Sequence, residues 1–77
     1  MSTHPGLQQY FLEHLRTHAL PVTVFLINGV KLQGQITAAD EACLLLQREN
    51  HLQLIYKHAV STVMPATDVP LPALGIE

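Results

Sequence analysis

The chain has 77 residues, with four fixed cations against six carboxylates and a formal net charge of −2 at pH 7. This charge argues against a protein that binds polyphosphates indiscriminately through a basic surface. A single cysteine excludes an intramolecular disulfide framework, and a chain of this length buries only about 60% of the surface that its unfolded form exposes. Because 48% of the residues are apolar, many of them on short segments, we predict one small domain that is stabilised by self-association.

Residues 1–6 are expected to form a flexible leader. They lack the charged and then apolar pattern of a secretory signal, and no apolar run in the chain approaches the ~20 residues that cross a bilayer. The sequence therefore predicts a cytoplasmic protein without a membrane partner.

Helical periodicity follows the leader and ends before Pro21, which blocks continuation of a helix and favours an extended conformation at Leu20. Polar side chains fall on the side of this segment opposite to the apolar ones. The spacing predicts an amphipathic helix of about three turns. Its apolar face comprises Leu7, Tyr10, Phe11, Leu12 and Leu15.

Five short strands are predicted after this helix. The first is apolar on both faces, so we expect both faces to be covered. Asn28-Gly29, the strongest short-range hairpin signal, predicts a two-residue turn with both residues at positive φ. In the second strand, Gly34 indicates a sharp bend or a close approach of two backbones. The predicted strands span residues 22–27, 31–37, 42–47, 52–56 and 59–64.

This order of elements predicts a mainly β fold, in which an N-terminal α-helix precedes a strongly bent five-stranded antiparallel barrel. The fourth and fifth strands are the expected edges, and the apolar residues of 52–56 are typical of an edge that pairs with another copy. A head-to-tail contact of this kind must close into a ring or grow without limit. We assign residues 7–65 to the domain and expect residues 66–77, which contain Pro70 and Pro72, to form a short disordered or extended tail.

Two motifs carry a resemblance to a known family. Residues 28–36 read Asn-Gly-Val-Lys-Leu-Gln-Gly-Gln-Ile, and residues 56–63 read Tyr-Lys-His-Ala-Val-Ser-Thr-Val. Residues 7–65 resemble the Hfq family of bacterial Sm-like (LSm) RNA chaperones, apart from one extra residue near 48–51. Members are homohexameric rings that pair small regulatory RNAs with messenger RNAs. The resemblance therefore implies an Sm-like barrel, one of the small SH3-like or OB-like barrels, assembled as a ring that binds single-stranded RNA in post-transcriptional regulation.

The resemblance also implies two RNA sites and a rim. At the proximal pore it implies six copies each of Lys57 and His58, with Gln8 reading a uracil edge. On the distal face it implies adenine-accepting pockets in which Phe25 stacks on a base and Gln53 pairs with a base edge. The proximal positions are Gln8, Glu41, Ala42, Tyr56, Lys57 and His58. The distal positions are Phe25, Leu26, Gly29, Val30, Lys31, Leu32, Gln33, Gln53, Ser61 and Thr62, and the rim position is Arg16.

Departures from the family pattern weaken the proximal site and the rim. Ala42 and Ala39 stand where the family has aromatic residues, and a base stacked on an aromatic ring is worth about 1–3 kcal/mol. Glu41 adds a carboxylate that repels phosphate, and the family's cluster of rim arginines is reduced to Arg16. We therefore expect A-rich RNA to bind the distal face and U-rich RNA to bind the proximal pore weakly.

Other interpretations of the same residues remain open. A degenerate ring could act as a protein-interaction scaffold with little RNA binding, whereas four cations argue against DNA compaction. Lys57 and His58 could be incidental charges on an exposed turn, and Phe25 a plain core aromatic. His14 and His18 are spaced to reach one metal ion from a helix, but two ligands without a third more often pack or face solvent. No nucleophile has a base and an orienting group, so we expect no enzyme, no cofactor and no metal.

Overall fold

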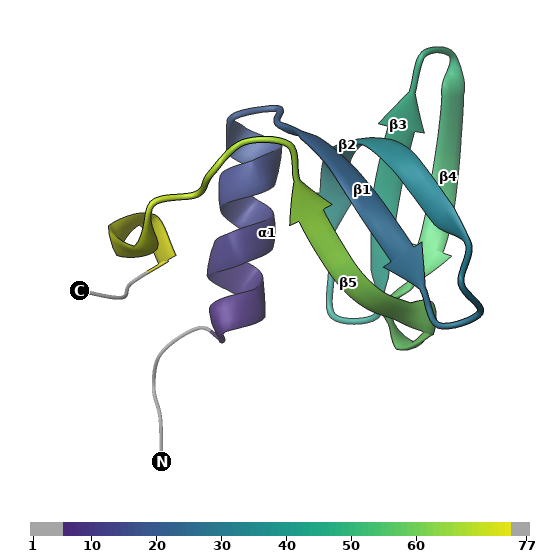
Figure 1. Cartoon of the computed structure of the whole chain (residues 1–77), viewed down its shortest axis with the longest axis horizontal. Coiled ribbons are helices and arrows are strands. Elements are labelled where there is room, and N and C mark those ends of the chain that lie inside the picture. The colour runs from purple at the N-terminus through teal and green to yellow at the C-terminus, as the bar shows by residue number, and fades with distance from the viewer. Residues whose placement is uncertain (1–5, 75–77) are drawn as a thin grey trace.

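The computed structural model describes residues 6–74 and contains one α-helix, five strands and two short 3-10 helices (Figure 1). All strand pairs are antiparallel, and the sheet order β4-β3-β2-β1-β5 makes β4 and β5 the edges. The predicted mainly β fold with an N-terminal helix is confirmed. Within residues 6–74, no helix is both long and apolar enough to span a membrane. The elements are α1 (Leu7–Thr17), β1 (Pro21–Leu26), β2 (Lys31–Ala39), β3 (Cys43–Arg48), β4 (His51–Tyr56), η1 (Lys57–Ala59), β5 (Val60–Pro65) and η2 (Leu71–Leu74).

Helix α1 packs its apolar stripe against the sheet. Leu12 and Leu15 are buried, as the periodicity predicts, whereas Leu7 in the first turn stays 59% exposed. Ala19 takes a φ of 51° after the helix, a conformation that reverses the chain at a C-terminus. Pro21 then begins β1, so the helix ends where the sequence predicts.

The connection between β1 and β2 differs from the predicted turn. Gly29 has a φ of 92°, but Asn28 is not among the residues at positive φ. Instead, the Asn28 side-chain oxygen accepts the N–H of Val30 at 3.0 Å, and Gly29 donates to the carbonyl of Leu26 at 2.9 Å. The expectation of two residues at positive φ is therefore wrong, because the asparagine side chain caps a longer loop in which only the glycine needs that conformation.

The core lies between α1 and one face of the sheet. Gly34 faces this core opposite Val22, and a Cβ atom on it would come within 2.5 Å of the Gln47 carbonyl oxygen. The predicted close approach of two backbones is thus confirmed. The buried cluster comprises Leu12, Leu15, Val22, Val24, Ile36, Leu44, Leu46 and Ile55.

Strand β1 buries only one of its two faces in the single chain. Val22 and Val24 are buried, while Pro21 is exposed and Thr23 and Phe25 are half-buried. The expectation that both faces are covered is therefore wrong for one copy. The uncovered face of β1 lies on the same side of the sheet as the polar residues of β2. We call this side the outer face of the sheet.

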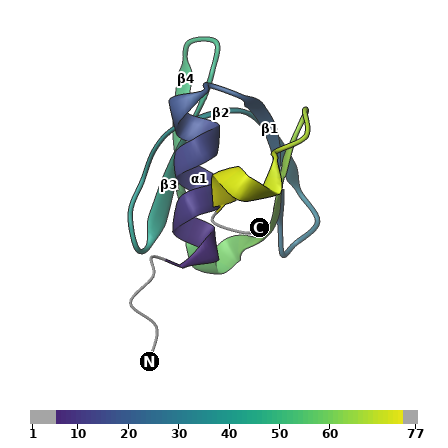
Figure 2. The ribbon, with the colours of Figure 1, turned by 90° about the vertical axis from the view of Figure 1, so that its left-hand side faces the viewer.

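The segment after β5 folds back onto α1, where the sequence predicted a disordered or extended tail. Ala66 donates its N–H to the Pro21 carbonyl at 2.9 Å, and η2 lies against α1 (Figure 2). Leu74 is buried and Val69 packs on the core. The tail expectation is thus wrong through Leu74, because single apolar side chains without periodicity can still dock on a neighbouring helix. Residues 1–5 of the predicted leader and 75–77 of the tail lie outside the described part of the chain.

Candidate nucleic-acid interface

Phe25 and Lys31 form the centre of a polar and aromatic patch on the outer face of the sheet. They are register partners between β1 and β2, and Phe25 also pairs with Thr62 of β5. The Lys31 ammonium lies 5.8 Å from the centroid of the Phe25 ring, within the range of a cation–π contact. The Ser61 hydroxyl donates to the Phe25 carbonyl at 3.2 Å. We call Phe25, Lys31, Ser61 and Thr62 the stacking platform.

The stacking platform has the chemistry of a single-stranded nucleic-acid site. Phe25 is half-buried and is not among the side chains packed against the core cluster, so the alternative of a plain core aromatic is not supported. A partly exposed ring offers a face to a base, and an adjacent ammonium can reach a phosphate. Gln33 lies on the same face of β2 as Lys31, and the loop residues Gly29 and Val30 directly precede this strand. Leu26 and Leu32 pack on the core beneath.

Gln53 is the one predicted distal residue that the single chain separates from this platform. It lies on β4, at the opposite edge of the sheet from β5, with β3, β2 and β1 between them. Its side chain is exposed. Within one copy, Gln53 therefore lies three strands away from Phe25 along the sheet.

The predicted proximal residues gather around η1. The Lys57 N–H donates to the Ala42 carbonyl at 2.7 Å, which ties the end of β4 to the β2–β3 connection. Gln8, Glu41 and Lys57 line one cleft of about 350 Å³. Arg16, the predicted rim residue, lines the same cleft, so the rim and proximal residues are contiguous.

Two rings contact each other at the end of β4, one from Tyr56 and one from His58 of η1. The Tyr56 and His58 rings are stacked with centroids 5.8 Å apart. Tyr56 is 54% exposed, so it is not a core residue of the single chain, and it ends the edge strand β4. Ala42 is also exposed and presents no ring, as its sequence position indicates.

Carboxylates dominate the charge of the proximal cleft. Asp40 accepts the backbone N–H groups of Ala42 at 2.9 Å and Cys43 at 2.8 Å. These two hydrogen bonds lower the pKa of Asp40, and the Lys57 charge lowers it further, so Asp40 stays ionised beside Glu41. The site prediction omitted Asp40, although an aspartate that begins a short loop is a signal for such a turn.

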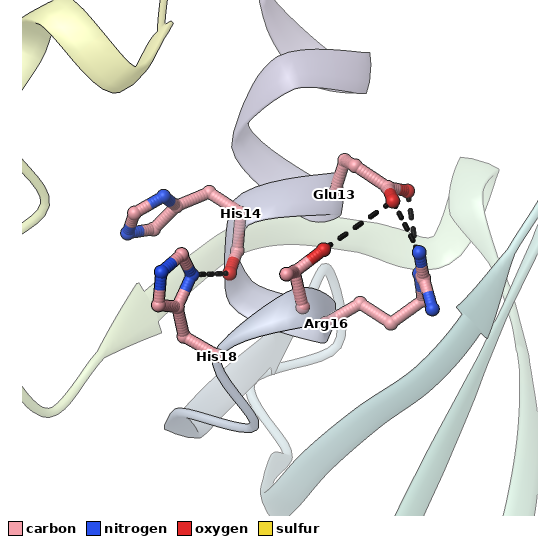
Figure 3. Close-up of polar contacts among 5 residues, drawn as sticks. Glu13, His14, Arg16 and His18 are labelled. Carbon is pink, nitrogen blue, oxygen red and sulfur yellow. Dashed lines mark hydrogen bonds and ion pairs between the residues drawn. The ribbon is translucent and has the colours of Figure 1, made fainter.

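Arg16 is already engaged by a neighbour on the helix. Its guanidinium pairs with the Glu13 carboxylate, with one hydrogen bond at 3.2 Å, and the Thr17 hydroxyl also donates to Glu13 (Figure 3). The hydrogen bond from Arg16 lowers the pKa of Glu13. The one predicted rim arginine, Arg16, thus has part of its positive charge neutralised by Glu13.

The His14 and His18 rings lie against each other at a tilt of 32°. Their ring centroids are 4.2 Å apart, and His18 Nδ1 donates to the His14 carbonyl oxygen at 3.0 Å (Figure 3). In residues 6–74, no group of three or more His, Cys, Asp or Glu side chains is arranged to hold a metal ion. The packing interpretation of this pair is therefore favoured.

The family model described as Hfq protein matches residues 7–70, and this match covers most of the chain. The chain belongs to the Hfq family. Curated Hfq relatives agree: it is 54% identical to the RNA-binding protein Hfq of Methylobacterium nodulans, over 94% of this chain and 86% of the relative. It is 56% identical to that of Ruegeria sp. (strain TM1040), over 91% of this chain and 89% of the relative.

Solved Hfq structures share the fold. A 1.55 Å crystal structure of the pleiotropic translational regulator Hfq superposes with a TM-score of 0.74 and 36% identity, covering 77% of this chain and 98% of the other. An Hfq protein from Anabaena sp., at 24% identity, has a TM-score of 0.69 over 75% of this chain and 93% of its own, and it supports the fold alone. The resemblance seen in the sequence, and the Sm-like fold that it implies, are confirmed.

Proposed function

We propose that this protein is an RNA-binding chaperone that acts in post-transcriptional regulation by pairing small regulatory RNAs with messenger RNAs. The stacking platform is the observation that carries the proposal, since it joins an aromatic face, an ammonium and hydroxyl groups on one surface. Its relatives bear the name RNA-binding protein, which does not favour the scaffold alternative. Acting on messengers, the protein would work in the cytoplasm as a binding protein and not as an enzyme.

A homohexameric ring completes the distal site in this proposal. Residues 7–65 form the ring domain, with 1–6 as leader and 66–77 as a proline-containing tail that docks on α1 through Leu74. Edge strand β4 exposes Leu52 and Leu54 by 60% and 55%, an apolar edge that main-chain pairing with β5 of a second copy would cover. This pairing brings Gln53 next to the neighbour's Ser61 and Thr62, which one chain keeps apart. Adenines would then bind between subunits, stacked on Phe25.

The proximal pore is the weaker RNA site in this proposal. Six copies of Lys57 and His58 would raise the positive potential at the pore, and Gln8 would read a uracil edge. Asp40 and Glu41 oppose that potential, and Ala42 supplies no stacking face. A-rich RNA should therefore bind more tightly than U-rich RNA.

Fluorescence anisotropy with labelled A-rich and U-rich oligonucleotides of equal length tests the proposal. We expect A-rich RNA to bind at least tenfold more tightly, which corresponds to about 1.4 kcal/mol. If neither oligonucleotide binds, the protein is a scaffold and the RNA proposal is wrong. If U-rich RNA binds more tightly, the distal assignment is wrong.

A further inference from the structure

A second cleft, of about 560 Å³, is lined by residues that do not overlap with the proximal residues. It is lined mainly by β1, β2 and β3 together with the turn that follows β3. These are the inner strands of the sheet, and Ala66, which follows edge strand β5, completes the lining. The polar groups in its lining are Thr23, Gln33, Gln35, Gln47, Arg48 and Glu49.

Strand register sets two glutamine side chains side by side in this cleft. Gln35 of β2 pairs directly with Gln47 of β3, and side chains at such positions have Cβ atoms about 4.5–5.5 Å apart. Gly34 lets the two backbones meet this closely, since a Cβ atom there would strike the Gln47 carbonyl oxygen. Two neighbouring primary amides present paired donors and acceptors toward solvent.

The polar side chains of the cleft are free for a ligand. Gln35, Gln47 and Arg48 are all exposed, and none makes a side-chain hydrogen bond with another residue of 6–74. The ion pair found in that part of the chain is Glu13–Arg16, which leaves Arg48 without a carboxylate partner there. Arg48, one of the four fixed cations of the chain, thus lines the same cleft as the two amides.

The cleft continues the stacking platform along the same face. Thr23 and Gln33 are the register pair next to Phe25 and Lys31, two residues further along each strand. Two residues of an antiparallel β-strand span about 6.8 Å. The flexible backbone of a single-stranded RNA can follow a step of this length. An RNA chain stacked on Phe25 can therefore extend over Gln33 toward Gln35 and Gln47.

We propose that this cleft, between Gln35, Gln47 and Arg48, binds one further nucleotide of the single-stranded RNA that occupies the stacking platform. The amides of Gln35 and Gln47 hydrogen-bond the base edge, and a glutamine amide matches adenine in a bidentate contact. Arg48 holds the flanking phosphate, while Glu49 can accept from an amino group of the base and disfavours a second phosphate. The inference rests on the proposed RNA-binding function and adds a subsite to it.

Salt-dependent binding of a fluorescein-labelled A-rich oligonucleotide to the full chain tests this subsite. Arg48→Ala should weaken binding and lower the slope of log affinity against log salt by about 0.7, since one phosphate contact is lost. The double variant Gln35→Ala/Gln47→Ala should weaken binding roughly three- to tenfold without changing the slope. Asn50→Ala, an exposed residue of the same turn that does not line the cleft, is the matched control and should bind like the unmodified protein.

Three results of this experiment have distinct meanings. Loss of affinity in both cleft variants, with the slope change confined to Arg48→Ala, supports the subsite. If Phe25→Ala weakens binding while both cleft variants match Asn50→Ala, the subsite is refuted and the proposed function stands. If the unmodified protein does not bind A-rich RNA, the proposed function and the subsite are both wrong. Side-chain NH₂ signals of Gln35 and Gln47 in NMR spectra should also shift on RNA addition, and unmoved signals would overturn the proposed contact.

Discussion

Replacing Phe25 by alanine removes the aromatic face of the stacking platform. Stacking of one base on an aromatic side chain is worth about 1–3 kcal/mol, so the affinity for A-rich RNA should fall about 5- to 140-fold. The ring carries no charge, so the slope of log affinity against log salt should stay unchanged. Lys31→Ala should do the reverse: a small loss of affinity, with the slope reduced by about 0.7 for the lost phosphate contact.

The fold should tolerate the loss of the Phe25 ring. Phe25 lies outside the buried cluster, so its loss should cost less than the roughly 3–5 kcal/mol typical of a core phenylalanine. Phe11 is the other phenylalanine of the chain and packs against the core. Phe11→Ala should therefore lower the free energy of unfolding more than Phe25→Ala, while leaving the A-rich affinity of the folded protein unchanged.

Fluorescence anisotropy at several salt concentrations, with chemical denaturation as the stability control, measures both effects. Phe25→Leu keeps an apolar side chain without a ring and should weaken binding like Phe25→Ala. If A-rich RNA binds both variants as tightly as the unmodified protein, the RNA sits elsewhere and the reasoning from the stacking platform is refuted.

Four other substitutions probe the proximal cleft, the sheet and the loop beside η1. Ala42→Phe should strengthen the binding of U-rich RNA by about 1–3 kcal/mol through a new stacking face, as measured by fluorescence anisotropy. Lys57→Ala should abolish the binding of U-rich RNA. Nanomolar affinity of the unmodified protein for U-rich RNA would contradict this account of the proximal cleft. Gly34→Ala places a Cβ atom 2.5 Å from the Gln47 carbonyl oxygen, so the melting temperature should drop by an amount that reflects roughly 1–3 kcal/mol of overpacking; an unchanged melting temperature would refute it. Asp40 has a lowered pKa because it accepts two backbone N–H groups, so its stabilising contribution is present above the ordinary carboxyl pKa and is lost as the pH falls through the lowered value. Thermal melts should therefore show Asp40→Ala less stable than the unmodified protein at pH 7, with the difference shrinking as the pH falls below the ordinary carboxyl pKa, and a difference that stays constant with pH would count against the loop geometry.

Hydrophobic periodicity, together with the positions of proline and glycine, was sufficient to predict the α-helix and the five strands of this fold. Alternation in β2 and the proline at position 21 gave boundaries within a few residues of those observed. The turn at Asn28 was predicted less well, because its side-chain oxygen satisfies the Val30 N–H and changes the loop. The prediction for residues 66–74 was wrong because Leu74 docks on helix α1, which is far away in the sequence.

The candidate site was predictable only as a set of positions. Phe25, Lys31 and Thr62 come together through strand register, which the sequence motif does not contain. Gln53 remains apart because its strand lies at the other edge of the sheet, and Arg16 is held by Glu13 through helical spacing. Distances and charge partners of this kind follow from the folded chain rather than from residue identities.

Native mass spectrometry of the full chain with one A-rich oligonucleotide tests the proposed RNA-binding ring most directly. The account predicts a complex of six chains, each of 8.5 kDa, whose RNA-bound fraction falls in Phe25→Ala while the six-chain assembly persists. A stable monomer at micromolar concentration, or a six-chain assembly that never retains A-rich RNA, would contradict it.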